Sequence, residues 1–369
     1  MFSGPDEVEI LSGQAEKVLH QYKEYYDFYT QKYGDKCAVW IQVGSFYEVY
    51  SYEEDNEEPW TNLREITKIC LLSIGYKRLK SLKHPYLMAG VGTDFIGKYR
   101  DTLLENGYVV VFIDQDSKNC KNPKRFVSKI LTPGTQIQEL RNDRSNTLVA
   151  INIENSAPRS KFSKEVDKIP LTIGLASVDI STGETLVYAT SSAQNYENKA
   201  LDDTYRFLQA QCASEVIIVC HGFKQLSEKQ QQDFQKHVTD QVMLENVFVR
   251  DFIMEIDITK LKPDYQNTVL QKAFFPNAVS GNASELLNLE RHPYETTALV
   301  TAIGSIYECR PRALQGLHRP EIWNSETHLV LEHNAIEQLD ISSSDRKKRS
   351  TTLFGILNHT ETSMGRRKL

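Results

Sequence analysis

Apolar and polar positions alternate with two different periods along the first part of the chain. In residues 6–33, tyrosines and aliphatic residues recur every three or four positions, which predicts one amphipathic helix that ends at Gly34. Four apolar runs of strand length follow, at 37–43, 46–50, 108–113 and 126–131. A run at 66–72 is compatible with a further strand, and 93–106 is interpreted as a helix that ends at Gly107. This mixture predicts an α/β unit.

Beyond residue 141 strands come first, and strands and helices then alternate. Strands are expected at 147–153, 172–180, 184–189 and 214–219, and helices at 197–212 and 224–237. From about residue 266 the apolar spacing turns helical, with helices expected at 283–289 and 294–309. These changes predict a multidomain α/β protein with mixed sheets. Its three units are expected at 1–140, 141–265 and 266–369.

Composition restricts the class of protein. Of the 369 residues, 40% are hydrophobic and 25% are charged, as in an ordinary globular protein. The net charge of −6 excludes a uniformly basic nucleic-acid coat protein but leaves room for a local basic face. No apolar run approaches the ~18 residues of a membrane span, and the N-terminus shows no secretory signal. The six cysteines form no CxxC pair, so we expect an intracellular protein without bound metal.

Basic residues are concentrated in two parts of the first unit. Residues 64–83 hold six basic residues against one acidic residue, and residues 118–129 hold five basic residues and no acidic one. A single cluster of this kind is usually a solvated face, but two in one unit of an acidic chain favour nucleic acid. The residues expected to contact a nucleic-acid backbone are Arg64, Lys68, Lys77, Arg78, Lys80 and Lys98.

One segment has the spacing of a phosphate-binding loop. Residues 92–99 match GxxxxGK, but Tyr99 stands where such a loop needs a serine or threonine to hold magnesium. We interpret the segment as a glycine turn that enters a helix, and we expect this chain neither to bind nor to hydrolyse ATP.

Asp179 is a candidate for metal-dependent catalysis. It lies at the end of an expected strand in the sequence Val-Asp-Ile-Ser-Thr-Gly, where an aspartate could hold magnesium in a nuclease or a phosphotransferase. Such chemistry needs several converging carboxylates, and the sequence offers no convincing second one. An aspartate that leads into a turn is the simpler interpretation, and we expect no catalytic residue in this chain.

The segment Gly-Ser-Phe-Tyr-Glu at 44–48 begins a strand after a glycine break. Alternation along the strand places Phe46 and Glu48 on one face and Tyr47 on the other. An aromatic ring and a carboxylate on one face of a strand end could project together toward a ligand. In most proteins, however, such a phenylalanine would be core and such a glutamate a surface charge.

Residues 44–48 resemble the GxFYE motif that opens MutS mismatch-repair proteins. Later segments resemble further motifs of that family in the same order, so that the resemblance covers nearly the whole chain. They include Met-Ala-Gly-Val at 88–91, Gly-Tyr-Val-Val-Val at 107–111, Leu-Thr-Pro-Gly-Thr at 131–135, Asp-Ile-Ser-Thr-Gly-Glu at 179–184, and parts of 329–341 and 353–367. Ser45 stands where many members have aspartate, and residues 41–50 are similar to the MutS proteins of large DNA viruses and some organelles.

The resemblance implies a fold and a function. The three units would be a mixed-sheet mismatch-binding domain, an RNase H-like connector without nuclease chemistry, and the beginning of a helical core domain. Phe46 would be wedged from the minor groove against a mispaired base, and Glu48 would hydrogen-bond the displaced base. The family's ATPase domain, which uses ATP and Mg, has no counterpart in this sequence, so we expect the chain to be a fragment of a longer protein.

The implied partner is double-stranded DNA with mispairs or small loops. The longer protein would be a DNA-dependent ATPase, would form a homodimer largely through its ATPase end, and could bind a MutL-type protein. Two alternatives stay open: a magnesium-dependent nuclease or phosphotransferase centred on Asp179, and a MutS paralogue that binds DNA junctions or partner proteins. The presence of the Phe-Tyr-Glu triplet argues against the paralogue.

Overall fold

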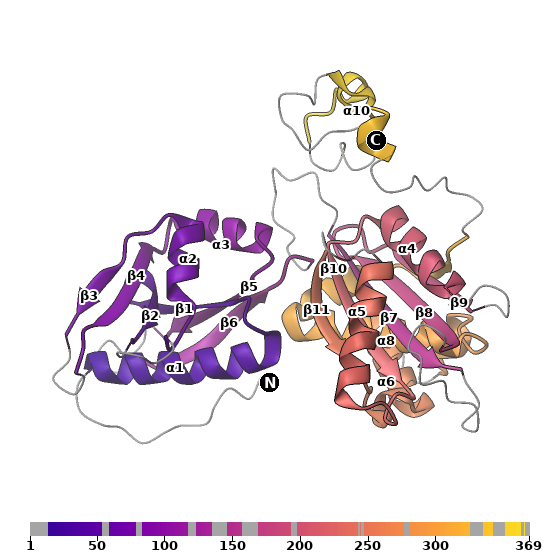
Figure 1. Ribbon diagram of the computed structural model, residues 1–369, viewed down its shortest axis with the longest axis horizontal. Coiled ribbons are helices and arrows are strands. Elements are labelled where there is room, and N and C mark those ends of the chain that lie inside the picture. Colours follow the sequence, from indigo (N-terminus) through magenta and orange to yellow (C-terminus); the bar gives the residue numbers. More distant parts are fainter. Residues whose placement is uncertain are drawn as a thin grey trace. The chain divides into compact units, whose positions relative to one another are not determined.

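The computed structural model shows two compact units, which divide in sequence between Pro133 and Gly134. The residues that it describes are 14–53, 59–78, 83–116, 123–134, 146–156, 169–192, 198–242, 244, 247–276, 281–324, 335–341, 351–362 and 365. Each unit is built around a six-stranded sheet that mixes parallel and antiparallel strands (Figure 1). The two mixed sheets with their helices agree with the expected α/β class.

In the first unit the strand order is β3-β4-β2-β1-β5-β6. The strands are β1 (Cys37–Val43), β2 (Phe46–Ser51), β3 (Gly75–Lys77), β4 (Tyr86–Gly92), β5 (Val109–Gln115) and β6 (Arg125–Leu131), and the helices are α1 (Gln14–Tyr33), α2 (Leu63–Cys70) and α3 (Ile96–Glu105). β1 and β5 are parallel, and the other neighbouring pairs are antiparallel. Helix α1 covers one face of the sheet, and α2 and α3 cover the other (Figure 1).

Apolar spacing explains how α1 packs on the sheet. Four tyrosines recur every three or four residues along the helix, and all are buried: Tyr22, Tyr26, Tyr29 and Tyr33. Tyr22 packs edge-on against Tyr50 of β2, with the ring centroids 5.3 Å apart. The helix therefore covers the sheet with aromatic rings, as the sequence pattern predicts.

The run at 66–72, expected as a strand, instead lies largely in α2. The buried residues of this helix fall at helical spacing, and they are Leu63, Ile66, Thr67 and Cys70. Leu71 ends the helix in the left-handed region, with φ of 54°. The strand interpretation is wrong because a short apolar run does not separate a strand from a buried helical turn.

In the second unit the strand order is β11-β10-β7-β8-β9-β12. The strands are β7 (Thr147–Asn155), β8 (Leu171–Asp179), β9 (Thr185–Ser191), β10 (Glu215–His221), β11 (Phe248–Ile253) and β12 (Glu321–Ile322). The helices are α4 (Lys199–Gln211), α5 (Glu228–Gln241), η4 (Ile258–Leu261), α6 (Pro263–Phe274), α7 (Ala283–Leu286), α8 (Pro293–Cys309), η5 (Pro311–Gly316), α9 (Ala335–Gln338) and α10 (Leu353–Leu357). None of the helices within the described ranges combines the length and the apolar character needed to cross a membrane.

Helix α8 covers one face of the second sheet and closes its core. Side chains of β7, β8, α6 and α8 share one buried cluster, which includes Leu148, Ala176, Leu270, Leu299 and Ile303. Gly174 of β8 lets α8 approach closely, because a Cβ there would lie only 2.2 Å from the carbonyl carbon of Tyr294. The helices expected to open a third unit at residue 266 thus complete the core of the second one.

A second buried cluster joins α4 and α5 to the same sheet, and it includes Val149, Ile218, Phe207 and Phe234. Helix α5 begins four residues later than expected, because Ser227 forms a capping box with Gln230 and so fixes its first turn. The six-stranded sheet therefore carries packed helices on two sides.

Candidate nucleic-acid interface

The turn between β1 and β2 presents Phe46 at one end of the first sheet. Gly44 in this turn has φ of 62°, in the left-handed region that glycine adopts without strain. Val43 and Phe46 pair across the turn, so Phe46 is the first residue of β2. Its side chain is 50% exposed. Because single exposed apolar residues are common on protein surfaces, the neighbours of Phe46 decide what it can do.

Glu48 lies two residues along the same strand, on the same face as Phe46, and it is half-buried. The Tyr50 hydroxyl donates a hydrogen bond to Glu48 Oε2. Burial, followed by this bond, raises the pKa of Tyr50, so the phenol stays a donor at neutral pH. A carboxylate has about four acceptor positions, so Glu48 can also accept a hydrogen bond from a ligand.

Tyr47 points to the opposite face, as the alternation predicts. Its hydroxyl donates a hydrogen bond of 2.6 Å to Asp114 Oδ1 of β5, and its ring packs edge-on against Phe112. Burial and the bond to Asp114 both raise the pKa of Tyr47. These contacts fix the rotation of β2 about its own axis, and Phe46 and Glu48 therefore keep facing the other way.

Glycines stand opposite Phe46 and Glu48 on the neighbouring strand. The pairing of β2 with β4 sets Gly92 opposite Phe46 and Gly90 opposite Glu48. A Cβ on Gly90 would lie 3.1 Å from Glu48 Cγ, closer than ordinary van der Waals contact. The glycine at residue 90 therefore leaves room for the Glu48 side chain over β4.

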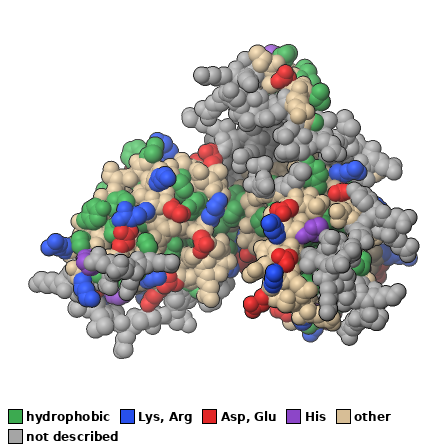
Figure 2. Space-filling view, in the orientation of Figure 1, with side chains coloured by type: hydrophobic (Ala, Val, Ile, Leu, Met, Phe, Trp, Pro, Cys, Tyr) green, Lys and Arg blue, Asp and Glu red, His purple; other side chains and the backbone are tan. Residues whose placement is uncertain are grey.

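The residues predicted to contact a nucleic-acid backbone have different surroundings. Arg64 of α2 donates two hydrogen bonds of 2.6 Å to Glu53, and this pairing lowers the pKa of Glu53. Arg64 is exposed in spite of this pairing, and so are Lys68, Lys77, Arg78 and Lys98. Lys80 lies outside the described residues. On the face shown in Figure 2, basic side chains are interspersed with acidic ones and do not gather into one patch.

Strand register shows which of these cations lies near Phe46. Lys77 pairs with Tyr86, which precedes Gly92 by six positions on β4. At ~3.3 Å per residue, this is roughly 20 Å along the strand from the position opposite Phe46. Lys98 instead lies in the first turn of α3, directly after the turn that begins at Gly92. The fold therefore brings Lys98, but not Lys77, close to the Phe46 end of the sheet.

Asp179 and the GxxxxGK segment both have structural explanations. Asp179 Oδ1 accepts hydrogen bonds from the amide of Ser181 at 2.7 Å, its hydroxyl at 2.6 Å and the amide of Thr182 at 3.3 Å, and it thereby closes the turn before β9. Within the described ranges, no group of three or more metal-ligating side chains occurs. Gly97 of the GxxxxGK segment already lies inside α3, which leaves residues 93–95 as the only link between strand and helix.

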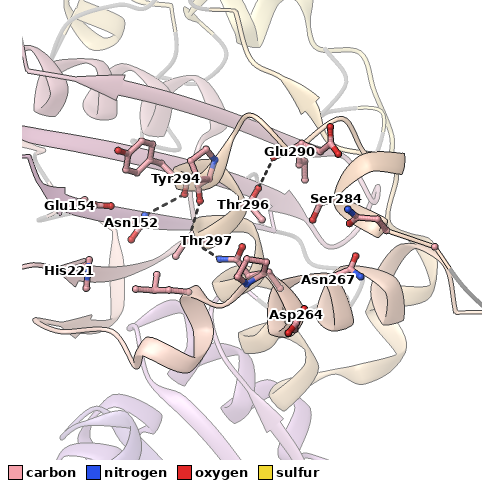
Figure 3. Close-up of a pocket in the computed structure, with 17 residues that line it drawn as sticks. Asn152, Glu154, His221, Asp264, Asn267, Ser284, Glu290, Tyr294, Thr296 and Thr297 are labelled. Atoms are coloured by element: carbon pink, nitrogen blue, oxygen red, sulfur yellow. Dashed lines mark hydrogen bonds between the residues drawn. The ribbon is translucent and has the colours of Figure 1, made fainter.

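A pocket of about 1000 Å³ lies in the second unit, beside β7, α6 and α8 (Figure 3). Its carboxylates are Glu154, Asp264 and Glu290, and the described part of its lining contains no lysine or arginine. Hydrogen bonds hold its wall: Asn152 Nδ2 donates to the carbonyl of Tyr294, and Gln266 Nε2 donates to Thr297 Oγ1. An acidic lining repels phosphate, so this pocket is unsuited to a nucleic-acid backbone.

Sequence reasoning singled out Phe46 and Glu48 but missed two residues that hold Glu48 in place. Tyr50 could have been predicted from the sequence, because the alternation that places Phe46 and Glu48 on one face of the strand places Tyr50 there too. Gly90 could not have been predicted, because it stands opposite Glu48 only through the pairing of two strands that are 40 residues apart.

Comparison with known proteins points to the part of the chain that holds Phe46 and Glu48. Residues 20–140, which include Phe46 and Glu48, match the family model of MutS domain I. Across 96% of its length the chain is 27% identical to a mutS homologue of Acanthamoeba polyphaga mimivirus. It is 26% identical to the DNA mismatch repair protein MutS of Lactobacillus johnsonii over 94% of its length, and 28% identical to that of Halothermothrix orenii over 93%. The chain spans 33% of the length of each of these curated relatives. The chain is therefore similar to MutS proteins along most of its length, and residues 20–140 match MutS domain I.

Proposed function

We propose that the first unit binds duplex DNA at mispaired or looped positions and that the β1–β2 turn is its reading element. The placement of Phe46 supports this most: the ring is half exposed, and the carboxylate two residues along the same face is held by a tyrosine. The relatives from Lactobacillus johnsonii and Halothermothrix orenii are named DNA mismatch repair proteins, which points to the same substrate.

Phe46 acts as a wedge between base steps. Inserting an apolar ring into the minor groove unstacks a step and kinks the duplex. The unstacking energy is smallest where pairing is already broken, so the ring enters a mispair more readily than a paired step. Discrimination thus arises from the deformability of the DNA and needs no direct reading of sequence.

Glu48 acts as a selective acceptor on the same side. Its negative charge faces the phosphates of the duplex, and this repulsion weakens binding to DNA that offers nothing in return. A displaced base offers an N–H donor, and a hydrogen bond to a carboxylate is stronger than a bond between neutral groups. Glu48 therefore improves discrimination by penalising paired DNA.

Exposed cations hold the DNA backbone without reading it. Among the described cations of the predicted set, Lys98 would contact the backbone next to Phe46, whereas Lys68, Lys77 and Arg78 would contact the duplex farther along. Binding of this kind releases counterions, so the affinity falls as the salt concentration rises.

The remaining family features are proposals as well. The second unit would serve as the RNase H-like connector, and the segment after it would open the helical core. ATP and Mg would act in a domain outside these 369 residues, and homodimer formation and binding of a MutL-type protein would belong to the longer protein. The fragment itself would have no enzymatic activity.

Two substitutions test the proposed function, with a third as control. Phe46→Ala and Glu48→Ala are titrated against a G·T duplex and its paired counterpart at one fixed salt concentration, with fluorescence anisotropy as the readout. The control is Phe126→Ala, because Phe126 is 52% exposed but pairs with Asp114, on the face to which Tyr47 points. It therefore removes an exposed ring of the same kind from the opposite side of the sheet.

Phe46→Ala should lose ~1–3 kcal/mol of binding to the G·T duplex, the usual value of one base–aromatic stack, and should bring its affinity toward that of paired DNA. Glu48→Ala should raise binding to paired DNA and shrink discrimination. Phe126→Ala should leave both affinities unchanged. If Phe46→Ala keeps full discrimination, or mainly lowers thermal stability, Phe46 is a core residue and the proposed function is wrong.

A further inference from the structure

Phe95 is a second exposed aromatic ring at the end of the sheet that carries Phe46. Its side chain is 73% exposed, more than that of Phe46 at 50%. It lies in the short turn between β4 and α3, in the segment interpreted from the sequence as a glycine turn. The proposed function gives this residue no role.

Strand pairing sets Phe95 on the same face as Phe46. Phe46 stands directly opposite Gly92 in the antiparallel pair of β2 and β4, so a side chain on Gly92 would point to the face that Phe46 occupies. The position of that missing Cβ lies 3.6 Å from Phe95 Cδ2, which is van der Waals contact. The ring of Phe95 therefore lies over Gly92, beside Phe46, in a space that a larger residue at 92 would occupy.

Backbone hydrogen bonds hold this turn against the turn that carries Phe46. The amide of Phe95 donates to the carbonyl of Gly92 at 3.0 Å, and the amide of Thr93 donates to the carbonyl of Ser45 at 3.0 Å. Ser45 immediately precedes Phe46. The two rings thus stand on two turns that are tied together, and neither ring requires a rearrangement of the backbone to face a ligand.

We propose that Phe95 is a second stacking residue of the DNA site, next to the wedge formed by Phe46. This proposal rests on the proposed function. A single mispair opens one base step and offers one base to Phe46, whereas an unpaired loop of several nucleotides also supplies a second, unstacked base. Since any base presents a π face to an aromatic side chain, Phe95 binds this second base without regard to its identity.

The consequence is a substrate preference that Phe46 alone does not give. Phe95 contributes to binding of duplexes with a loop of two or more unpaired nucleotides and contributes little to a single G·T mispair. It contributes nothing to fully paired DNA, in which stacked neighbours leave no base free for it.

The test uses the full 369-residue chain and four variants: Phe46→Ala, Phe95→Ala, Phe95→Trp and Phe126→Ala. Each is titrated by fluorescence anisotropy against three duplexes of one sequence context, which are fully paired, carry one G·T mispair, or carry a three-nucleotide loop. A 2-aminopurine in the loop supplies a second readout, because its fluorescence is quenched when the base stacks on an aromatic ring. Circular dichroism confirms that each variant is folded.

Phe95→Ala should lower affinity for the looped duplex about tenfold, change the G·T and paired duplexes less than about threefold, and relieve the quenching. Phe95→Trp should keep loop affinity and quenching, since it keeps an aromatic face, and Phe126→Ala should behave like the unsubstituted chain. An equal loss on all three duplexes, or no loss on the loop, would overturn the proposal. If Phe95→Ala gives such a result while Phe46→Ala still abolishes discrimination, the proposed function stands and only the role of Phe95 is wrong. If the unsubstituted chain does not discriminate between the duplexes at all, both the proposed function and the role of Phe95 are wrong.

Discussion

Glu48 in the first unit and Glu215 in the second are both glutamates on sheet strands, but their surroundings differ. Glu215 is fully buried, accepts a 2.8 Å hydrogen bond from the amide of Gly134, and lies 3.5 Å from Nη1 of Arg250. The side chain of Arg250 is itself only 2% exposed. Glu48 is half-buried, accepts a bond from one phenol, and lies over a glycine.

This difference separates a structural carboxylate from one that can serve a ligand. A fully buried charge costs several kcal/mol unless protein groups satisfy it, and Glu215 has such groups around it. A half-buried carboxylate at a surface retains contact with solvent and can exchange it for a donor from a partner. The same residue type therefore holds the second unit together and is available for recognition in the first.

Among the substitutions that test the difference between the two glutamates, Glu215→Ala should cause the largest loss of stability. The substitution leaves Arg250 buried without its nearest carboxylate, and removing one partner of a buried pair typically costs ~3–5 kcal/mol. Asp251 and Glu308 lie 3.7 and 3.8 Å from Arg250, so we expect a value near the lower end of that range. Urea denaturation followed by circular dichroism measures the loss.

Glu53→Ala is the matched control for that prediction. Its partner Arg64 is 55% exposed, and exposed ion pairs contribute at most ~1 kcal/mol. Because Arg64 lowers the pKa of Glu53, the small contribution is present at neutral pH and is lost as the pH falls below about 4. Equal losses for Glu215→Ala and Glu53→Ala would show that Glu215 is not the structural carboxylate described above.

A smaller effect is expected when a side chain is added between β8 and α8. In Gly174→Ala the new Cβ would meet the backbone of Tyr294 at 2.2 Å, and α8 would have to move away from the sheet. Overpacking of this kind costs ~1–3 kcal/mol. In Gly304→Ala within α8 the new Cβ meets no atom within 4 Å apart from the backbone of its own helix, and it should stabilise the unit by ~0.5–1 kcal/mol, because alanine is the better helix former. Thermal denaturation measures the stability of both variants. If Gly174→Ala is as stable as the unsubstituted chain, α8 does not pack as closely on β8 as described.

Local pattern predicted most of the elements of the fold, and long-range packing accounts for what it missed. The tyrosine spacing of α1 and the apolar runs of β1, β5 and β7 were sufficient to place them. Strand β4 gives only a weak strand signal because its glycines interrupt the apolar run, and β3 was missed because it is only three residues long and exposed. The boundary expected at 265/266 reflects a change in period, whereas the packing of α8 on β8 depends on Gly174, which no periodicity reveals.

In the candidate site, too, local pattern predicted some residues and long-range strand pairing brought in the others. Phe46 and Glu48 could be singled out because they lie within five consecutive residues and alternate on one strand. The pairing of β2 with β4, which brings Gly90, Gly92 and the turn of Phe95 to that strand, joins segments about 45 residues apart. Likewise, charge alone placed Arg64 among the DNA contacts, and the structure shows that it is paired with Glu53.

The smallest effect, and the one that bears most directly on the contrast between the two glutamates, is expected from Gly90→Ala. The new Cβ would lie 3.1 Å from Glu48 Cγ, so the carboxylate must shift by a few tenths of an ångström while Tyr50 still holds its Oε2 atom. We expect a loss of two- to threefold in discrimination between G·T and paired duplexes, or ~0.4–0.7 kcal/mol at ~1.4 kcal/mol per tenfold change. Thermal stability should change little, because Gly90 is exposed.

Gly97→Ala serves as the control, since its Cβ would meet only the far end of Arg100 at 3.9 Å. Titration of both variants at one salt concentration measures the effect. If Gly90→Ala discriminates as well as Gly97→Ala, the position of the Glu48 carboxylate is not what reads the DNA, and its charge alone must account for the effect of Glu48→Ala.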